Sequence, residues 1–156
     1  MFVPEENLLG REHEGFYLIM ANFQWERLLM ALGAVGAMQV CFEQTLEFVR
    51  GRSDLLGSQA IRHAMAEIAL TVQAGRDVTY AGLRRFAAGA DAVREVTIAK
   101  LATQRAAFDA IDACLQIHGL DAPPELERAL RDARLGPIGG GTDEIMKEIL
   151  GRSMGL

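Results

Sequence analysis

The sequence predicts an all-α protein, an antiparallel four-helix bundle with extra short helices at its C-terminal end. Apolar residues recur at helical spacing through three long segments, and no segment after residue 10 has the alternating pattern of a strand. Brief connections separate the helical segments, which is typical of neighbours that run in opposite directions. At 156 residues the chain is long enough to bury one core.

The first helix is expected from Phe16 to about Arg50, after a polar segment that ends at Gly15. Gly33 and Gly36 lie inside it, and each lowers its intrinsic stability by about 1 kcal/mol relative to alanine. We expect these two glycines to let a neighbouring helix pack closely. The apolar positions that repeat at helical spacing are Leu28, Leu29, Leu32, Val35, Met38, Phe42, Leu46 and Val49.

A second helix is expected over residues 59–83, because the preceding connection, residues 50–58, is rich in helix-breaking residues. Its inner face is expected to carry Ala64, Ile68, Val72 and Ala81.

Three further helices are expected in the rest of the chain. Asp91 has a side chain suited to cap the first of them, and Thr142 to cap the last. Proline at the first position favours the start of the middle one. The expected segments are 91–119, 125–134 and 143–151.

Composition favours a globular intracellular protein. The net charge is −5 and the chain is 50% hydrophobic, which argues against a basic nucleic-acid surface. Cys41 and Cys114 are isolated thiols, as is typical of a reduced, cytoplasmic protein. The apolar stretch 28–42 is shorter than the ~20 residues that span a bilayer and is interrupted by small and polar residues. We therefore expect no membrane span.

Few patterns point directly to chemistry. His13, His63 and His118 are far apart and none has a neighbouring cysteine or carboxylate at ligand spacing, so no metal site is expected. The sequence also has no nucleotide-binding or hydrolase motif.

Glu26 is a candidate general base because Phe23, Trp25, Leu29 and Met30 surround it. A carboxylate on an apolar surface has its pKa raised by desolvation, which suits a base that works near neutral pH. Spacing alone favours the other interpretation, a carboxylate that pairs with the following arginine or faces solvent.

Gly139, Gly140 and Gly141 directly precede an acidic helix. A glycine-rich turn that opens a helix can bring backbone N–H groups to a phosphate. It can also simply join two helices. Both interpretations stay open at this point.

Several short motifs occur in an order that resembles the C-terminal helical domain of the acyl-CoA dehydrogenase family. The motifs are VPEENLLG at 3–10, GF at 15–16, WERLLMALGAVGAMQ at 25–39, QAIRHAMAE at 59–67, AKL at 99–101, QIHG at 116–119, DAR at 132–134 and GGTDEIMKEILGR at 140–152. The resemblance implies that residues 1–12 are a remnant of a preceding β domain or linker, and that residues 13–156 form the bundle. The alternative is an unrelated bundle with chance matches.

The resemblance implies FAD-dependent α,β-dehydrogenation of acyl-CoA thioesters, in which a carboxylate removes the α proton and a hydride passes to the flavin. Most members place that carboxylate at the position of Gly140. A smaller subgroup, similar to the long-chain and isovaleryl enzymes, places it on the first bundle helix, where Glu26 stands here. We therefore expect Glu26 to be the base, and Arg27, Gly140 and Gly141 to lie at the acyl-CoA site. Arg27 could equally hold its helix to the neighbours.

The resemblance also implies contacts with FAD from two sets of residues. Thr142 and Glu144 match one cofactor segment, and Gln116 and Gly119 match another that reaches the flavin of a neighbouring subunit. A third segment is matched only in part, by Arg52 or Arg50 together with Gln59. The departures from the family pattern fall on cofactor loops: Leu120 replaces a glycine, Leu56-Gly57 replaces Phe-Gly, and the loop after Gly119 is short.

The partners that the resemblance implies are acyl-CoA, an electron-transfer flavoprotein or similar acceptor, and further copies of the chain in a dimer or tetramer. The 156 residues alone are expected to be inactive, because they lack the β domain that would flank the flavin. The rival interpretation is a non-catalytic helical subunit that serves only to assemble a heteromeric dehydrogenase.

Overall fold

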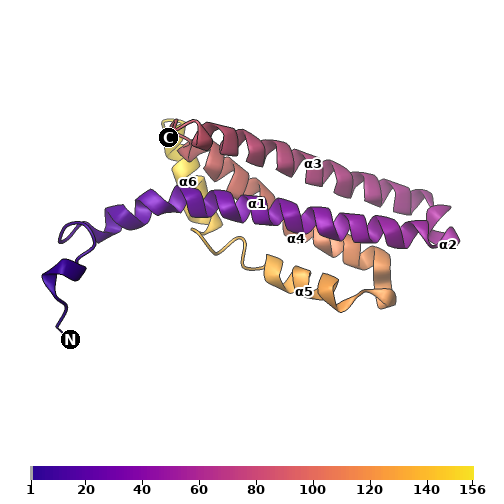
Figure 1. The fold of residues 1–156 in the computed structure, drawn as a ribbon. Coiled ribbons are helices and arrows are strands. Elements are labelled where there is room, and N and C mark those ends of the chain that lie inside the picture. The colour runs from indigo at the N-terminus through magenta and orange to yellow at the C-terminus, as the bar shows by residue number, and fades with distance from the viewer. Residues whose placement is uncertain (1) are drawn as a thin grey trace.

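The computed structural model describes residues 2–156 and confirms the predicted fold class. This range is about 79% helical and contains no strand. Four helices form the bundle, with successive helices antiparallel (Figure 1): α1 (Gly15–Arg50), α3 (Gln59–Ala87), α4 (Val93–His118) and α5 (Pro124–Ala133). The short elements are η1 (Glu5–Asn7), α2 (Ser53–Leu56), η2 (Gly119–Asp121) and α6 (Asp143–Ser153).

The predicted ends and caps hold with small differences. The second long helix runs four residues further than expected, to Ala87. The Thr142 hydroxyl accepts a hydrogen bond from the Ile145 N–H at 3.4 Å, as expected of an N-cap. The N-cap position of α4 is Ala92 rather than Asp91, but the Asp91 carboxylate still accepts from the Val93 N–H at 3.1 Å.

The core lies between α1, α3 and α4, with α5 closing one side. Its buried members include Val35, Met38, Ile68, Val72, Ile111 and Leu126. On α3 the prediction was wrong for Ala81, which is exposed. The buried stripe of α3 advances by alternating steps of three and four residues and therefore reaches Gly82 instead.

Gly33 and Gly36 do not contact a neighbouring helix of this chain, so the prediction of close packing on them was wrong. Both are exposed, and a Cβ on either would meet nothing within 4 Å. Close approach occurs on α3 instead. A Cβ at Gly75 would lie 3.2 Å from Met38 Cε, and one at Gly82 would lie 3.5 Å from the Glu95 backbone.

The N-terminal turns of α1 extend beyond the bundle (Figure 1). Phe16, Tyr17 and Ile19 are each more than half exposed there. Within residues 2–14, η1 is the only helical element, and Phe2 and Val3 form no strand. That residues 1–12 derive from a β domain stays a prediction.

By length and composition, α1 is one helix that could cross a membrane, and 39% of its apolar window is buried inside the structure. The core helix of a soluble protein has the same properties, and the inner face of α1 packs on α3 and α4. The expected lack of a membrane span stays a prediction.

Candidate active site

The glycine turn, residues 139–141, lies against α1 at Arg27, which follows Glu26, and at Met30. Arg27 Nε donates a hydrogen bond to the Gly140 carbonyl oxygen at 2.9 Å. The Arg27 guanidinium also lies over the Phe23 ring, 5.2 Å from its centroid. The fold thus brings together Arg27 and Gly140, which are 113 positions apart in the chain.

Arg27 is only 7% exposed. Burial lowers its pKa, and the neighbouring Glu26 charge opposes that change. Its contact with the turn agrees with the interpretation in which Arg27 holds α1 to its neighbours, and it leaves the proposed contact with acyl-CoA untested.

Glu26 is half-buried at the edge of the same cluster. Its Oε1 accepts a hydrogen bond from Asn22 Nδ2, one turn earlier, at 2.8 Å. The Arg27 guanidinium is directed to Gly140 and Phe23. Glu26 therefore keeps a carboxylate that is oriented by an amide and remains reachable from outside.

The turn needs glycine for two reasons. Gly140 and Gly141 have φ angles of +64° and +110°, a region that side chains rarely adopt. A Cβ at Gly140 would lie 2.6 Å from Met30 Sδ, and one at Gly141 would lie 2.8 Å from Met146 Cε. Packing and backbone conformation therefore explain these glycines, as the helix-joining interpretation requires.

A second buried cation reaches the turn from α4. Lys100 has 0% exposure, and its Nζ donates to the Gly141 carbonyl oxygen at 2.6 Å. Burial lowers the pKa of Lys100; the Asp143 charge raises it, and the Arg27 charge lowers it further. Two positive side chains from different helices thus bind consecutive carbonyls of one turn.

The start of α6 completes this cluster. Asp143 is 6% exposed, and its Oδ2 accepts from Arg105 Nε at 2.5 Å. Its backbone N–H donates to the Pro137 carbonyl oxygen at 3.0 Å, which ties α6 to the chain before the turn. The other carboxylate oxygen, Oδ1, is buried without a hydrogen-bond partner.

Sequence reasoning assigned no role in the site to Lys100, Gln104, Arg105 or Asp143, although Lys100 and Asp143 lie in the quoted motifs. The signal for Lys100 was present, because it falls on the buried stripe of α4 between Val96 and Thr103. A polar side chain on a buried stripe needs a hydrogen-bond partner. Nothing local indicated that the partner would be a carbonyl 41 positions further along the chain.

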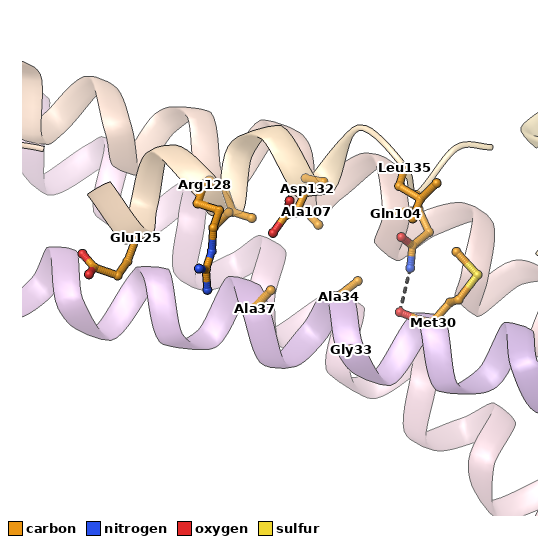
Figure 2. Close-up of a pocket in the computed structure, with 14 residues that line it drawn as sticks. Met30, Gly33, Ala34, Ala37, Gln104, Ala107, Glu125, Arg128, Asp132 and Leu135 are labelled. Atoms are coloured by element: carbon orange, nitrogen blue, oxygen red, sulfur yellow. Dashed lines mark hydrogen bonds between the residues drawn. The ribbon is translucent and has the colours of Figure 1, made fainter. Parts of the chain in front are cut away.

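A groove of about 390 Å³ runs between α1, α4 and α5 (Figure 2). It begins at Met30, whose carbonyl accepts from Gln104 Nε2 at 2.7 Å. Figure 2 shows the Arg128 and Asp132 side chains extending from α5 toward α1. Most of the lining is apolar: Ala34, Ala37, Ala107, Ile111, Ala129, Ala133 and Leu135.

The groove lies on the face of α1 that carries Glu26. Glu26, Met30, Gly33 and Ala37 are spaced by four, three and four residues, so they share one stripe of the helix. The volume is within the range of small-molecule pockets.

The residues that the resemblance assigns to FAD divide between the two ends of the bundle. Thr142 and Glu144 open α6, next to the glycine turn. Gly119 follows α4 at the opposite end, 19 positions after Lys100, or about 28 Å along the helix. Figure 1 shows α6 and α2 at opposite ends. One chain therefore does not bring these two sets together.

The other residues assigned to FAD lie at the end of the bundle that is opposite the glycine turn. Arg52 Nη1 binds Asp121 at 2.9 Å and so connects the end of α1 to the loop after α4. Gln116 Nε2 donates to Asp112 at 2.7 Å, and Gln59 is exposed at the start of α3. Gly119 has φ +58°, and a Cβ there would meet nothing within 4 Å.

Each set leaves its own end of the bundle open to a flavin. Around Gly119 the open space lets a planar group approach the main chain. At the other end the half-buried Thr142 offers a hydroxyl beside the helix N-terminus, where backbone N–H groups point outward. At this end, hydrogen bonds from the backbone N–H of Glu144 and then from the Thr142 hydroxyl lower the pKa of the Glu144 carboxyl.

The histidines lie away from the glycine turn. His118 is buried, its ring stacked on Phe48 with centroids 4.1 Å apart and its Nε2 3.2 Å from Thr45 Oγ1. His13 and His63 are exposed. Within residues 2–156 no group of three His, Cys, Asp or Glu side chains is placed to hold a metal ion.

The family model "Acyl-CoA dehydrogenase, C-terminal domain" matches residues 13–155. An isovaleryl-CoA dehydrogenase from Solanum tuberosum is 35% identical over 98% of this chain and 39% of its own length. A long-chain specific acyl-CoA dehydrogenase from Sus scrofa is 32% identical over 97% of this chain and 37% of its length. The chain thus spans about two fifths of these relatives.

Among solved structures, an acyl-CoA dehydrogenase from Geobacillus kaustophilus superposes with a TM-score of 0.93 at 33% identity. The match covers 99% of this chain and 42% of that one. Fold, motif order and overall identity agree with the resemblance that the sequence motifs gave. The chain belongs to the acyl-CoA dehydrogenase family and forms its C-terminal helical domain.

Proposed function

We propose that the natural gene product containing these 156 residues is an FAD-dependent acyl-CoA dehydrogenase in which Glu26 removes the α proton. The observation that carries the proposal is the contact between Arg27 and Gly140. Through Arg27, which follows Glu26, it brings together the two segments in which family members carry their carboxylate, and only the α1 segment has one here.

Glu26 has the features that a base requires. The hydrogen bond from Asn22 fixes its orientation, and half-burial leaves it reachable by a substrate. We assign Arg27, Gly140 and Gly141 to the wall against which the acyl-CoA lies. FAD, when bound, supplies the hydride acceptor for the β hydrogen.

We assign the acyl chain to the groove that starts at Met30. It begins one helical turn from Glu26 and is lined mainly by apolar side chains. Its volume of about 390 Å³ lies within the range of pockets that hold small molecules. This size suits a fatty acyl tail.

Thr142 and Glu144 are proposed to hold the flavin of their own subunit. Arg52, Gln59, Gln116 and Gly119 are proposed to hold that of a neighbour, because about 28 Å separates the two ends. This division requires at least a dimer of the chain. A cytoplasmic location, and an electron-transfer flavoprotein as the acceptor, belong to the same proposal.

A second candidate is a non-catalytic subunit that only assembles with partners. It is supported by apolar side chains exposed at the far end, where Leu120 replaces a family glycine and Leu56 replaces a phenylalanine. Such a subunit would bury these leucines against a partner and carry no flavin of its own.

The experiment starts from the purified natural gene product. Flavin absorbance together with acyl-CoA oxidation by a dye acceptor supports the enzyme, and a colourless protein supports the assembly subunit. Glu26→Gln is expected to retain flavin and lose turnover. The 156 residues alone are expected to oxidise no acyl-CoA.

Glu43→Gln is the matched control. Glu43 lies on the same helix, and its Oε1 accepts from Gln39 Nε2, four residues earlier, at 2.6 Å, just as Glu26 accepts from Asn22. Equal activity in both variants would remove Glu26 from the base role.

A further inference from the structure

Lys100 has a role that the family-derived site does not include. It is fully buried in α4 and donates to the Gly141 carbonyl oxygen at 2.6 Å. Burying a charge costs free energy unless it is paired and hydrogen-bonded. A methionine of similar length would fill the same space without that cost, so packing alone does not account for the amine.

The contact is specific to the turn next to Glu26. Arg27 binds the Gly140 carbonyl from α1, and Lys100 binds the Gly141 carbonyl from α4. The turn is therefore held from two helices at once. Because a trans peptide places its N–H opposite its C=O, the N–H groups of Gly141 and Thr142 are directed away from these two cations.

The other contacts of the turn come from the residues just before it and from two methionines: the Gly139 N–H donates to the Leu135 carbonyl oxygen at 2.9 Å, and Met30 and Met146 pack against the glycines. The φ angles of Gly140 and Gly141 favour glycine, whose backbone has more conformational freedom than that of other residues. After the turn, the next backbone hydrogen bond to an earlier segment runs from the Asp143 N–H to the Pro137 carbonyl oxygen. Without Lys100, the peptide that joins Gly141 to Thr142 loses its carbonyl partner.

We propose that Lys100 is a positioning residue: its ammonium group, together with Arg27, fixes the glycine turn as the wall against which the acyl-CoA meets Glu26. This inference rests on the proposed function. A displacement of about 1 Å at such a wall can lower turnover about 10²-fold. Lys100 itself touches no substrate and acts only through Gly141.

The test is Lys100→Met in the natural gene product, with Lys147→Met as control, because Lys147 is exposed on α6. The expected result is retained flavin, a kcat lowered about 10²-fold and a KM changed much less. Hydrogen exchange at Gly139 and Asp143, whose N–H groups donate to the Leu135 and Pro137 carbonyl oxygens, is expected to quicken at least 10-fold, while α1 and α4 keep their protection. The control is expected to match the wild type.

Unchanged exchange at the turn, or unchanged kcat in an active enzyme, overturns the inference. If Lys100→Met does not fold, Lys100→Gln, which keeps a hydrogen-bond donor, is tested in its place. Loss of hydrogen-exchange protection throughout the bundle of Lys100→Gln, rather than at the turn, also overturns the inference. The proposed function fails separately, when the wild-type protein binds no flavin or oxidises no acyl-CoA. The exchange result at the turn can still be read in that case.

Discussion

Gly140→Ala tests the geometry of the glycine turn directly. Alanine at φ +64° costs about 1–2 kcal/mol of backbone strain. Its Cβ would lie 2.6 Å from Met30 Sδ, and overpacking of this kind costs about 1–3 kcal/mol. The expected loss in the free energy of unfolding is therefore between about 2 and 5 kcal/mol.

Met30→Ala separates these two contributions. Shortening Met30 removes the clash and leaves the backbone strain, so the double variant should be more stable than the sum of the single changes by about 1–3 kcal/mol. Urea unfolding followed by the fluorescence of Trp25, the only tryptophan, gives all four free energies. A Gly140→Ala loss below about 1 kcal/mol, or strict additivity of the pair, would refute this account of the turn.

Three further predictions follow from which side chains are exposed and which are buried. Gly33→Ala should stabilise the chain by about 0.5–1 kcal/mol in urea unfolding, because open space surrounds the position in α1; destabilisation would mean that another chain packs there. Burial lowers the pKa of His118, and the Asp121 charge opposes this change. The His118 imidazole therefore binds a proton more readily in the unfolded chain than in the folded one. Stability from neutral His118 is therefore present above about pH 6.5 and is lost as the pH falls, and His118→Phe should show a smaller loss between pH 7 and pH 5. Burial raises the pKa of Cys41 to about 11 and also raises the pKa of Cys114. At pH 8 a thiol reagent should therefore label either cysteine only as fast as the chain unfolds. Rapid labelling of the folded protein would contradict their burial.

The helices were predictable because their signals are local. Apolar spacing and caps such as Thr142 depend on residues a few positions apart, and they gave the order and extent of the helices. The inner face of α3 was less certain, since a helix tolerates small residues on either side. Ala81 and Gly82 differ by one position, and only the approach of α4 decides which of them is buried.

The candidate site was only partly predictable because its contacts are long-range. The motif resemblance pointed to Glu26, Arg27 and Gly140, and the structure brings Arg27 onto Gly140. The reason for the glycines, a turn closed by Met30 and Met146, lies in packing between distant segments. The buried Lys100 needed the position of the turn before its partner could be known.

The most direct test of Glu26 as the base is the exchange of acyl-CoA α protons with D₂O, because this step requires the base and no electron acceptor. With the natural gene product, wild type and Glu43→Gln are predicted to exchange these protons equally fast. Glu26→Gln, with its flavin retained, is predicted to be at least about 10²-fold slower. Exchange at the wild-type rate in Glu26→Gln would contradict the assignment of Glu26 as the base.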